Sequence, residues 1–286
     1  MGRIAIVTDS TADLPADVAA SAGITVVPLH VRFGDAEFRD GVDLSTAQFW
    51  KRLLTPGSAF PSTAAPSPGV FRDAFEAAFG TGAEGVVCCV IGSRLSGTFG
   101  SASVAAGLLP ERDIQIVDTG STSMATGMAA ILATEFAATG LSAAGVAEAV
   151  RARLPDLDLY VAVDTLEYLH RNGRLSAARA AIGTVLSMKP IITVRDGLVV
   201  LEQTVRPRAK AREVAIELIA AHAVERIAVM HTPTSTPAEV DGFRARLVAR
   251  LPGGIDPAHV MTGVIGASTG PHLGPGMMGA ILLRRR

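Results

Sequence analysis

The segment at residues 91–99, IGSRLSGTF, joins an apolar run to a stretch that we expect to be helical. Backbone N–H groups at the start of a helix have no partners within the helix, and they attract anions. The hydroxyl groups of Ser96 and Thr98 stand at that start, with Gly97 between them. We therefore expect Ser96, Gly97 and Thr98 to form an anion site that suits a carboxylate or a phosphate.

The same segment lacks two patterns that would make it catalytic. A nucleophile elbow needs the pattern G-x-S-x-G, which the neighbours of Ser96 do not match. A P-loop needs Gly-Lys followed by Ser or Thr, and no such triplet follows. Ser96 would act as a nucleophile only if a general base lay within hydrogen-bond reach.

Two further segments rich in Ser and Thr come earlier in the chain. Residues 7–14, VTDSTADL, are either a strand end with helix caps or the floor of a pocket that organises neighbouring loops. Residues 61–68, PSTAAPSP, contain prolines that stiffen a loop. Such a loop either holds the Thr63 hydroxyl toward a ligand or is an ordinary connector.

Residues 270–279, GPHLGPGMMG, form a glycine-rich segment near the end of the chain. Its glycines match G-x-G-x-x-G, but a strand rather than a helix follows, so we reject dinucleotide binding. The small residues let His272 approach another group closely, although a lone His also suits a structural role. The six His residues are scattered without metal-ligand spacing, so we expect no metal and no cofactor.

The first half of the chain repeats the order strand, polar loop, helix, which indicates a parallel α/β sheet of the Rossmann-like kind. In such sheets ligands bind at the carboxyl ends of the strands, where the Ser/Thr-rich loops fall. We expect strands at residues 3–8, 24–33, 36–38, 85–91 and 113–117, a loop at 55–68, and helices at 44–54, 68–79, from 99 onward, 124–138 and 142–154.

The second half mixes antiparallel and crossover connections, which predicts a mixed sheet. Asp196-Gly197 between two apolar runs is a strong hairpin signal. We place a domain boundary near Pro155, with an N-terminal α/β domain at residues 1–155 and a C-terminal α/β domain at 156–286. We expect strands at 159–163, 191–195, 198–205, 226–230, 259–264 and 280–283, and helices at 165–170, 177–187, 209–221 and 238–251.

Composition excludes several classes of protein. Lys+Arg is 26 and Asp+Glu is 27, so no bulk positive charge favours a nucleic-acid partner. The 49% of apolar residues rules out a disordered chain. Prolines and glycines break the stretch at 257–283, so we expect no membrane insertion. Cys88 and Cys89 are adjacent and face opposite sides of a strand, so we expect buried thiols and a cytoplasmic protein.

Taken together, seven segments resemble the DegV family of bacterial fatty-acid-binding proteins, and they occur in the family's order between residues 4 and 283. The matching segments are VTDSTADL, PSTAAPSP, SRLSGTFGSA, VDTLEYLHRNGRLS, LSMKPI, VRPRAKA and HLGPG.

The resemblance implies a non-enzymatic carrier for lipid transport or fatty-acid metabolism. A long-chain fatty acid such as palmitate would lie in a tunnel between two α/β domains, with its carboxylate held by Thr63 and Ser96 and with His272 near the head group. In some members a separate fatty-acid kinase phosphorylates the bound acid, and Arg174 and Arg206 match residues that face this partner.

The sequence does not decide which residues line the tunnel for the alkyl tail of the fatty acid. Phe71, Phe75 and Phe79 recur every four residues and, like the small residues around 180–188, either line the tunnel or are simple core. Two other functions also stay open. One is an enzyme that processes a small acid or phosphate with Ser96 or His272, and the other is a regulatory module with an empty or collapsed cleft.

Overall fold

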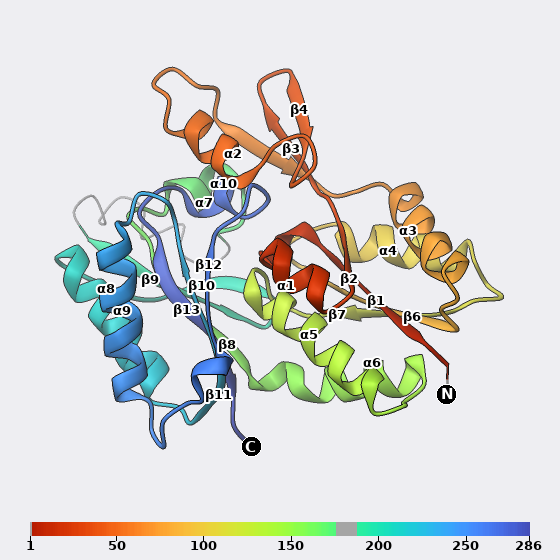
Figure 1. The fold of residues 1–286 in the computed structure, drawn as a ribbon. Coiled ribbons are helices and arrows are strands. Elements are labelled where there is room, and N and C mark those ends of the chain that lie inside the picture. Colours follow the sequence, from red (N-terminus) through yellow and green to blue (C-terminus); the bar gives the residue numbers. More distant parts are fainter. Residues whose placement is uncertain (1, 176–187) are drawn as a thin grey trace.

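A computed structural model describes residues 2–175 and 188–286. The chain forms a parallel four-stranded sheet, a mixed six-stranded sheet and a small three-stranded sheet (Figure 1). The predicted α/β architecture, with a parallel N-terminal sheet and a mixed C-terminal sheet, is confirmed. The chain passes from the first sheet to the second through the short 3-10 helix η2 (Leu154–Asp156). We call the parts before and after η2 the N-terminal and C-terminal halves.

The parallel sheet has the strand order β2-β1-β6-β7 and is covered by helices on both faces. Its central strand β6 reads GVVCCV and is buried throughout, as expected for a strand covered on both sides. Cys88 faces α3 and α4, whereas Cys89 faces α5 and α6, and both thiols are free. The elements are β1 (Ile4–Asp9), β2 (Ile24–Val27), β6 (Gly85–Val90), β7 (Asp113–Asp118), η1 (Ser10–Ala12), α1 (Ala16–Ser21), α3 (Pro68–Gly80), α4 (Thr98–Gly107), α5 (Met124–Ala138) and α6 (Ala143–Arg153).

The single strand that we expected at 24–33 is wrong, because this stretch forms two strands in different sheets. β2 ends before Pro28, which has no N–H for a sheet ladder, and β3 begins two residues later. The predicted loop at 55–68 also holds an unpredicted strand, β5, at the edge of the small sheet, with Pro61 as its first residue. The elements here are β3 (His30–Phe33), β4 (Ala36–Arg39), α2 (Thr46–Leu53) and β5 (Pro61–Ala64).

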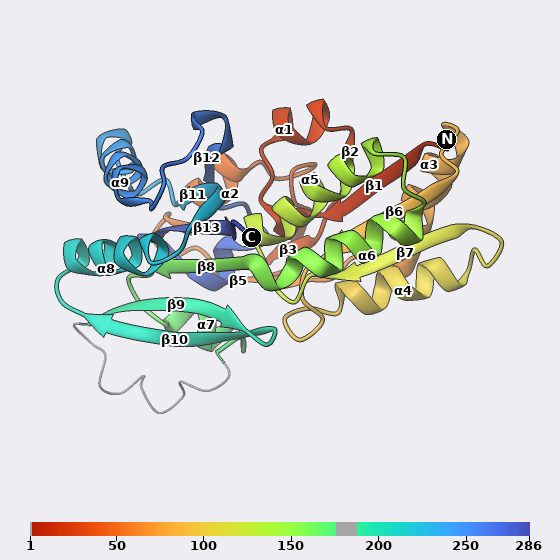
Figure 2. The ribbon, with the colours of Figure 1, turned by 90° about the horizontal axis from the view of Figure 1, so that it is seen from below.

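The six-stranded sheet has the order β10-β9-β8-β13-β11-β12, and only β11 and β12 are parallel in it. The predicted hairpin turns at Asp196 and Gly197, whose φ angles of 51° and 72° suit a tight two-residue turn (Figure 2). The elements are β8 (Leu157–Ala162), α7 (Glu167–Arg171), β9 (Lys189–Arg195), β10 (Leu198–Val205), α8 (Arg208–Ala220), β11 (Val224–His231), α9 (Pro237–Arg250), η4 (Pro257–His259), β12 (Val260–Val264), α10 (Gly270–Leu273) and β13 (Met278–Arg284).

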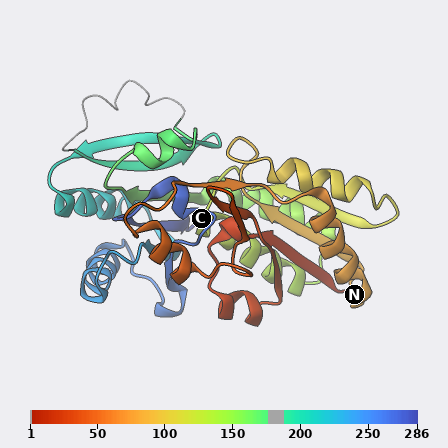
Figure 3. The same cartoon turned by 90° about the horizontal axis from the view of Figure 1, so that it is seen from above.

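Side-chain alternation on the central strands gives the six-stranded sheet two buried faces. Tyr160 and Leu282 pack with α8 and α9 on one face. Leu159, Val161 and Ile281 point to the opposite face, where they join a core shared with the N-terminal half. The small sheet and α2 contribute to this shared core as well, and from above their segment spans the junction of the two halves (Figure 3).

The phenylalanine stripe of α3 is core and does not line a ligand tunnel. Phe71 and Phe75 have no exposed surface and pack against Val86 and Val90 of the parallel sheet. Phe79 packs against the same cluster, with the Arg112 guanidinium over its ring. The helix expected at 177–187, and all but Met188 of the other candidate tunnel segment, lie outside the described residues.

Replacing Phe75 by Ala tests this assignment. We expect Phe75→Ala to lower the free energy of unfolding by roughly 3–5 kcal/mol, because it leaves a cavity in a closed core. Urea denaturation measures the change, and Leu108→Ala, at the exposed residue directly after α4, serves as the control. A loss below roughly 1 kcal/mol would contradict the core assignment.

Candidate functional site

A cavity lies between the six-stranded sheet and the loops of the N-terminal half. The open space between its atoms, counted out to the solvent at its mouth, is about 770 Å³. Residues from both halves line it: Thr11, Leu29, Thr63, Ile91, Leu95, Ser96, Thr122, Ser123, Leu159, Val161, Leu169, Arg174, Ile192, Thr193, Val194, Val199, Ser268, Thr269, His272, Leu273, Met277 and Ile281.

The C-terminal half supplies most of the apolar lining. Leu159, Val161 and Ile281 reach the cavity from the inner face of β8 and β13, and Ile192 and Val199 reach it from the hairpin. Their position follows from the strand alternation described above, since the residues between them face α8 and α9. An alkyl chain would find an apolar sheet surface here.

The sequence-predicted residues Thr63, Ser96 and His272 all line this cavity, although they come from three distant segments. Thr63 lies on the edge strand β5, Ser96 on the loop between β6 and α4, and His272 on α10. Thr63 Oγ1 and His272 Nε2 are 3.0 Å apart, and Ser96 Oγ lies 2.8 Å from Thr98 Oγ1. The fold thus gathers hydroxyl groups and an imidazole in one cavity.

Gly97 and Thr98 lie behind Ser96 and are not among the residues that line the cavity. Thr98 is fully buried, and its backbone N–H donates to Ser96 Oγ at 3.3 Å. Gly97 is exposed at the start of α4. Thr98 therefore supports the Ser96 hydroxyl from the helix start, and direct contact of Gly97 or Thr98 with a ligand stays a prediction.

Arg174 and Arg206 occupy different places. The Arg174 guanidinium donates to the carbonyls of Leu95, at 3.2 Å, and Asn172, at 2.7 Å. Arg174 lines the cavity and also an outer groove, so its charge lies beside the hydroxyl residues and at the surface. Arg206 is exposed on the segment before α8 and does not line the cavity.

The environment of His272 keeps its imidazole neutral. Burial lowers the pKa of His272 to about 4, and the positive charge of Arg174 acts in the same direction. Nδ1 is buried without a hydrogen-bond partner in the described structure. Because an orphaned buried N–H is rarer than an orphaned acceptor, the proton belongs on Nε2. His272 then donates to Thr63, which leaves the Thr63 hydroxyl proton for the cavity.

Sequence reasoning missed a set of buried carboxylates behind one cavity wall. Asp13 accepts from Ser123 and Thr269, and Asp40 accepts from Ser268. Of Asp13 and Asp40, only Asp13 belongs to a segment that we had singled out, VTDSTADL. Both interpretations of that segment fit the structure, because Asp9 caps η1 while Asp13 joins the neighbouring loops. Asp40 carried no signal, because neither its neighbours nor its spacing mark it as a site residue.

The comparisons with known proteins agree with this fold. The family model described as "Uncharacterised protein, DegV family" matches residues 3–285. The chain belongs to the DegV family. A DegV domain-containing protein of Streptomyces coelicolor is 36% identical to it over 287 residues, which cover 99% of each chain.

Solved structures of DegV proteins superpose closely on the chain. One from Thermus thermophilus, described as a fatty-acid-binding DegV family protein, has a TM-score of 0.89 and 32% identity and covers 99% of this chain and 100% of its own. A stearic-acid-binding protein from Eubacterium ventriosum has a TM-score of 0.88 and 26% identity, covering 99% and 98%. DegV of Bacillus subtilis, described as a fatty-acid-binding protein, has a TM-score of 0.86 and 28% identity and covers 100% of both chains.

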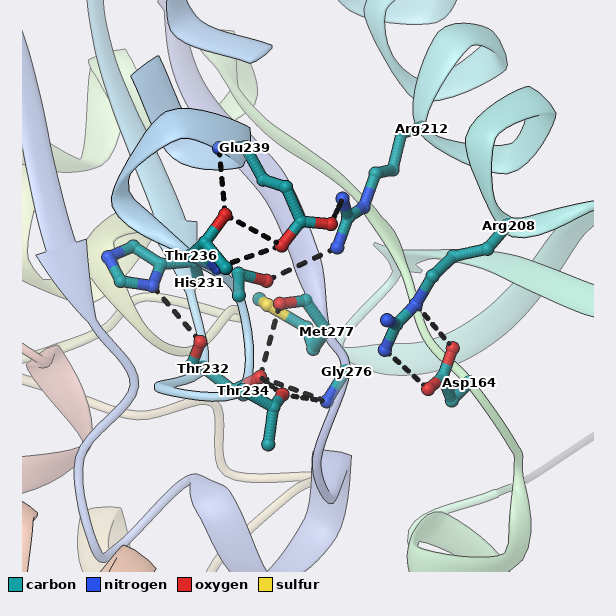
Figure 4. Close-up of polar contacts among 11 residues, drawn as sticks. Asp164, Arg208, Arg212, His231, Thr232, Thr234, Thr236, Glu239, Gly276 and Met277 are labelled. Carbon is teal, nitrogen blue, oxygen red and sulfur yellow. Dashed lines mark hydrogen bonds and ion pairs between the residues drawn. The ribbon is translucent and has the colours of Figure 1, made fainter. Parts of the chain in front are cut away.

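In this DegV chain a polar network fixes the cavity wall that carries Met277 (Figure 4). The Gly276 N–H donates to the hydroxyls of both Thr232 and Thr234 at 2.9 Å, and the Thr232 N–H donates to the Met277 carbonyl. These bonds join the loop after β11 to the loop before β13. Two ion pairs lie nearby, Arg208 with Asp164 and Arg212 with Glu239.

Within residues 2–175 and 188–286, no group of three or more His, Cys, Asp or Glu side chains could hold a metal ion. None of the helices described is long and apolar enough to cross a membrane.

The protonation of His272 gives a testable pH dependence. Its pKa rises from about 4 in the folded chain to 6.5 in the unfolded chain, so between these values only the unfolded chain takes up the proton. We expect this contribution to stability to be complete above pH 6.5 and to fall as the pH drops toward about 4. Denaturation at several pH values, with His272→Gln as the reference, measures it. An equal pH dependence in both proteins would contradict the neutral imidazole.

Proposed function

We propose that the chain binds a long-chain fatty acid such as palmitate in the cavity between its two halves. The observation that carries this proposal is the combination, in one cavity, of the apolar strands β8, β9, β10 and β13 with the hydroxyls of Thr63 and Ser96. The superposable DegV structures described as binding fatty acids support it. The division into domains at residues 1–155 and 156–286 is part of the same proposal.

The alkyl tail supplies most of the affinity. Each buried methylene contributes roughly 0.8 kcal/mol, so a chain of about 14 methylenes gives about 11 kcal/mol before the costs of binding. A hydrogen bond to a charged group adds roughly 1.5–3 kcal/mol. The tail therefore determines how tightly the acid binds, and the head group determines which way it points.

The carboxylate is held at the Thr63 and Ser96 end. Thr63 donates its hydroxyl proton to the carboxylate, because its oxygen already accepts from His272. Ser96 donates while Thr98 supports it from the start of α4. The positive charge of Arg174, at the same end of the cavity, favours an anion there.

The carrier presents the bound acid to a separate fatty-acid kinase. Arg174 reaches both the cavity and the outer groove, so it can meet a partner near the head group, and Arg206 is exposed on the segment before α8, where a partner can contact it. This role places the chain in lipid transport or fatty-acid metabolism inside the cell, as the sequence predicted.

The two alternative functions receive less support. An enzyme that used Ser96 needs a base beside it, whereas Ser96 Oγ pairs with Thr98 and His272 pairs with Thr63. A regulatory module would not need an apolar lining that meets the hydroxyls of Thr63 and Ser96 in one cavity, as this chain has. A binding protein that leaves chemistry to its partner fits these contacts better than either.

The protein purified from a bacterial host tests the proposal. Mass spectrometry after solvent extraction should find a long-chain acid, and the delipidated protein should take up palmitate again. No extracted lipid together with no uptake would refute the proposed function.

Removing the two hydroxyls tests the head-group site. We expect Thr63→Ala and Ser96→Ala each to weaken palmitate binding by roughly tenfold or more, because each removes a hydrogen bond to a charged group. Titration of the delipidated protein measures the affinity. Ser62→Ala and Ser93→Ala are matched controls, since both are exposed and neither lines the cavity. Unchanged affinity in the two test variants would refute the assignment.

Replacing Arg206 tests the partner surface. We expect Arg206→Ala to leave palmitate affinity unchanged, because Arg206 does not line the cavity, and to slow phosphorylation of the bound acid by a fatty-acid kinase. Exposed Arg112, beside Phe79 of α3, provides a matched control. Equal phosphorylation rates for Arg206→Ala and Arg112→Ala would contradict a partner-facing role.

A further inference from the structure

Four hydroxyl groups on one wall of the cavity donate hydrogen bonds to buried carboxylates. Thr11, Ser123, Ser268 and Thr269 all line the cavity. An ionised carboxylate only accepts hydrogen bonds, so each hydroxyl that pairs with one must donate. The pairs are Thr11 with Asp9, Ser123 and Thr269 with Asp13, and Ser268 with Asp40.

Asp13 is the residue that joins the two halves in this network. Its Oδ2 accepts from Ser123 of the N-terminal half at 2.6 Å. Its Oδ1 accepts from the Gly266 N–H of the C-terminal half at 2.9 Å, and Thr269 Oγ1 lies 3.0 Å from both carboxylate oxygens. One side chain therefore fixes the direction of two hydroxyls that face each other across the junction.

The backbone at this point is held in unusual conformations. Asp13 has a φ of 49°, a left-handed conformation that Asp tolerates. Ser123 has φ 55° and ψ −147°, which is close to a region that glycine alone adopts readily. Such a conformation persists only where other contacts enforce it, and the hydrogen bond from Ser123 to Asp13 is one of them.

We propose that Asp13 is a positioning residue for the fatty-acid carboxylate. It accepts hydrogen bonds from the hydroxyls of Ser123 and Thr269, so these hydroxyls cannot donate to a ligand in the cavity. This inference rests on the proposed function. With those protons engaged, the hydroxyls of Ser123 and Thr269 offer a bound carboxylate only oxygen lone pairs, backed by the negative charge of Asp13. The head group is then directed away from Ser123 and Thr269 and toward hydroxyls such as those of Thr63 and Ser96, which contact no carboxylate side chain in the described structure. Asp13 thereby sets the orientation of the fatty acid in the cavity.

The carboxylate state of Asp13 defines the conditions for a test. Burial raises the pKa of Asp13 to about 7, against the hydrogen bonds that favour its ionised form. Asp9 and Asp40 also face this wall with raised pKa, and His231 lines the cleft on its outer side. Measurements well above pH 7 keep Asp13 ionised in the wild-type protein.

Asp13→Asn tests the proposal with palmitic acid labelled with carbon-13 at its carboxyl. The amide NH₂ that replaces Oδ2 donates to Ser123 Oγ, so the Ser123 proton turns toward the cavity as a new donor. We expect one carboxyl resonance in the wild-type complex and a second, resolved resonance in Asp13→Asn. Adding Ser123→Ala removes the new donor and should restore the single resonance, which a merely structural role of Asp13 would not do.

The exposed turn residue Asp35 provides the matched control, since Asp35→Asn should leave the single resonance unchanged. If Asp13→Asn does not fold, Asp40→Asn combined with Ser10→Ala removes both hydrogen-bond acceptors of the Ser268 hydroxyl on the same wall and should give the same result. A folded variant that shows only the wild-type resonance, or two resonances in the wild type itself, would overturn the proposal. If the wild type takes up no palmitate at all, the proposed function fails instead.

Discussion

The junction between the inner face of the six-stranded sheet and the loops of the N-terminal half holds both the core and the cavity. Leu159, Val161 and Ile281 point into this junction because the strand alternation sends their neighbours to α8 and α9. The same surface therefore packs against Met124 and Met128 of α5 and also lines the cavity. Any change in how the two halves meet would alter core packing and ligand binding together.

Buried carboxylates make this junction specific. Hydrophobic contact is not directional, so it alone would not fix one arrangement of the two halves. A buried charge is costly unless its hydrogen bonds are satisfied, and this requirement selects one arrangement. Asp13 and Asp40 meet this requirement only when the loop at 266–269 of the C-terminal half lies against the N-terminal half. The residues that fix the register of the junction thus also determine which cavity hydroxyls can donate.

Much of the fold could be predicted from the sequence, because it depends on local patterns. The buried run of β6, the hairpin at Asp196 and Gly197 and the mixed second sheet all follow from periodicity and turn residues. The errors occurred where few residues carry the signal. β5 is a four-residue edge strand inside a proline-rich segment, and the division between β2 and β3 depends on Pro28.

The candidate site was predictable only in part. Thr63, Ser96 and His272 were named from their motifs, but only the folded chain brings Thr63 and His272 within 3.0 Å of each other. Asp40 and Ser268 are 228 positions apart, and no local pattern indicates that they pair. The apolar lining could not be located either, since the Phe stripe of α3 has the same periodicity as a tunnel wall yet packs in a closed core.

The most direct test of the central claim is a crystal structure with a fatty acid that carries bromine at its terminal carbon. Anomalous scattering locates the bromine, and the electron density locates the carboxylate. The account predicts bromine against the apolar face of β8 and β13, and carboxylate oxygens within hydrogen-bond distance of Thr63 and Ser96. Bromine beside Thr63, or an acid bound outside this cavity, would contradict it.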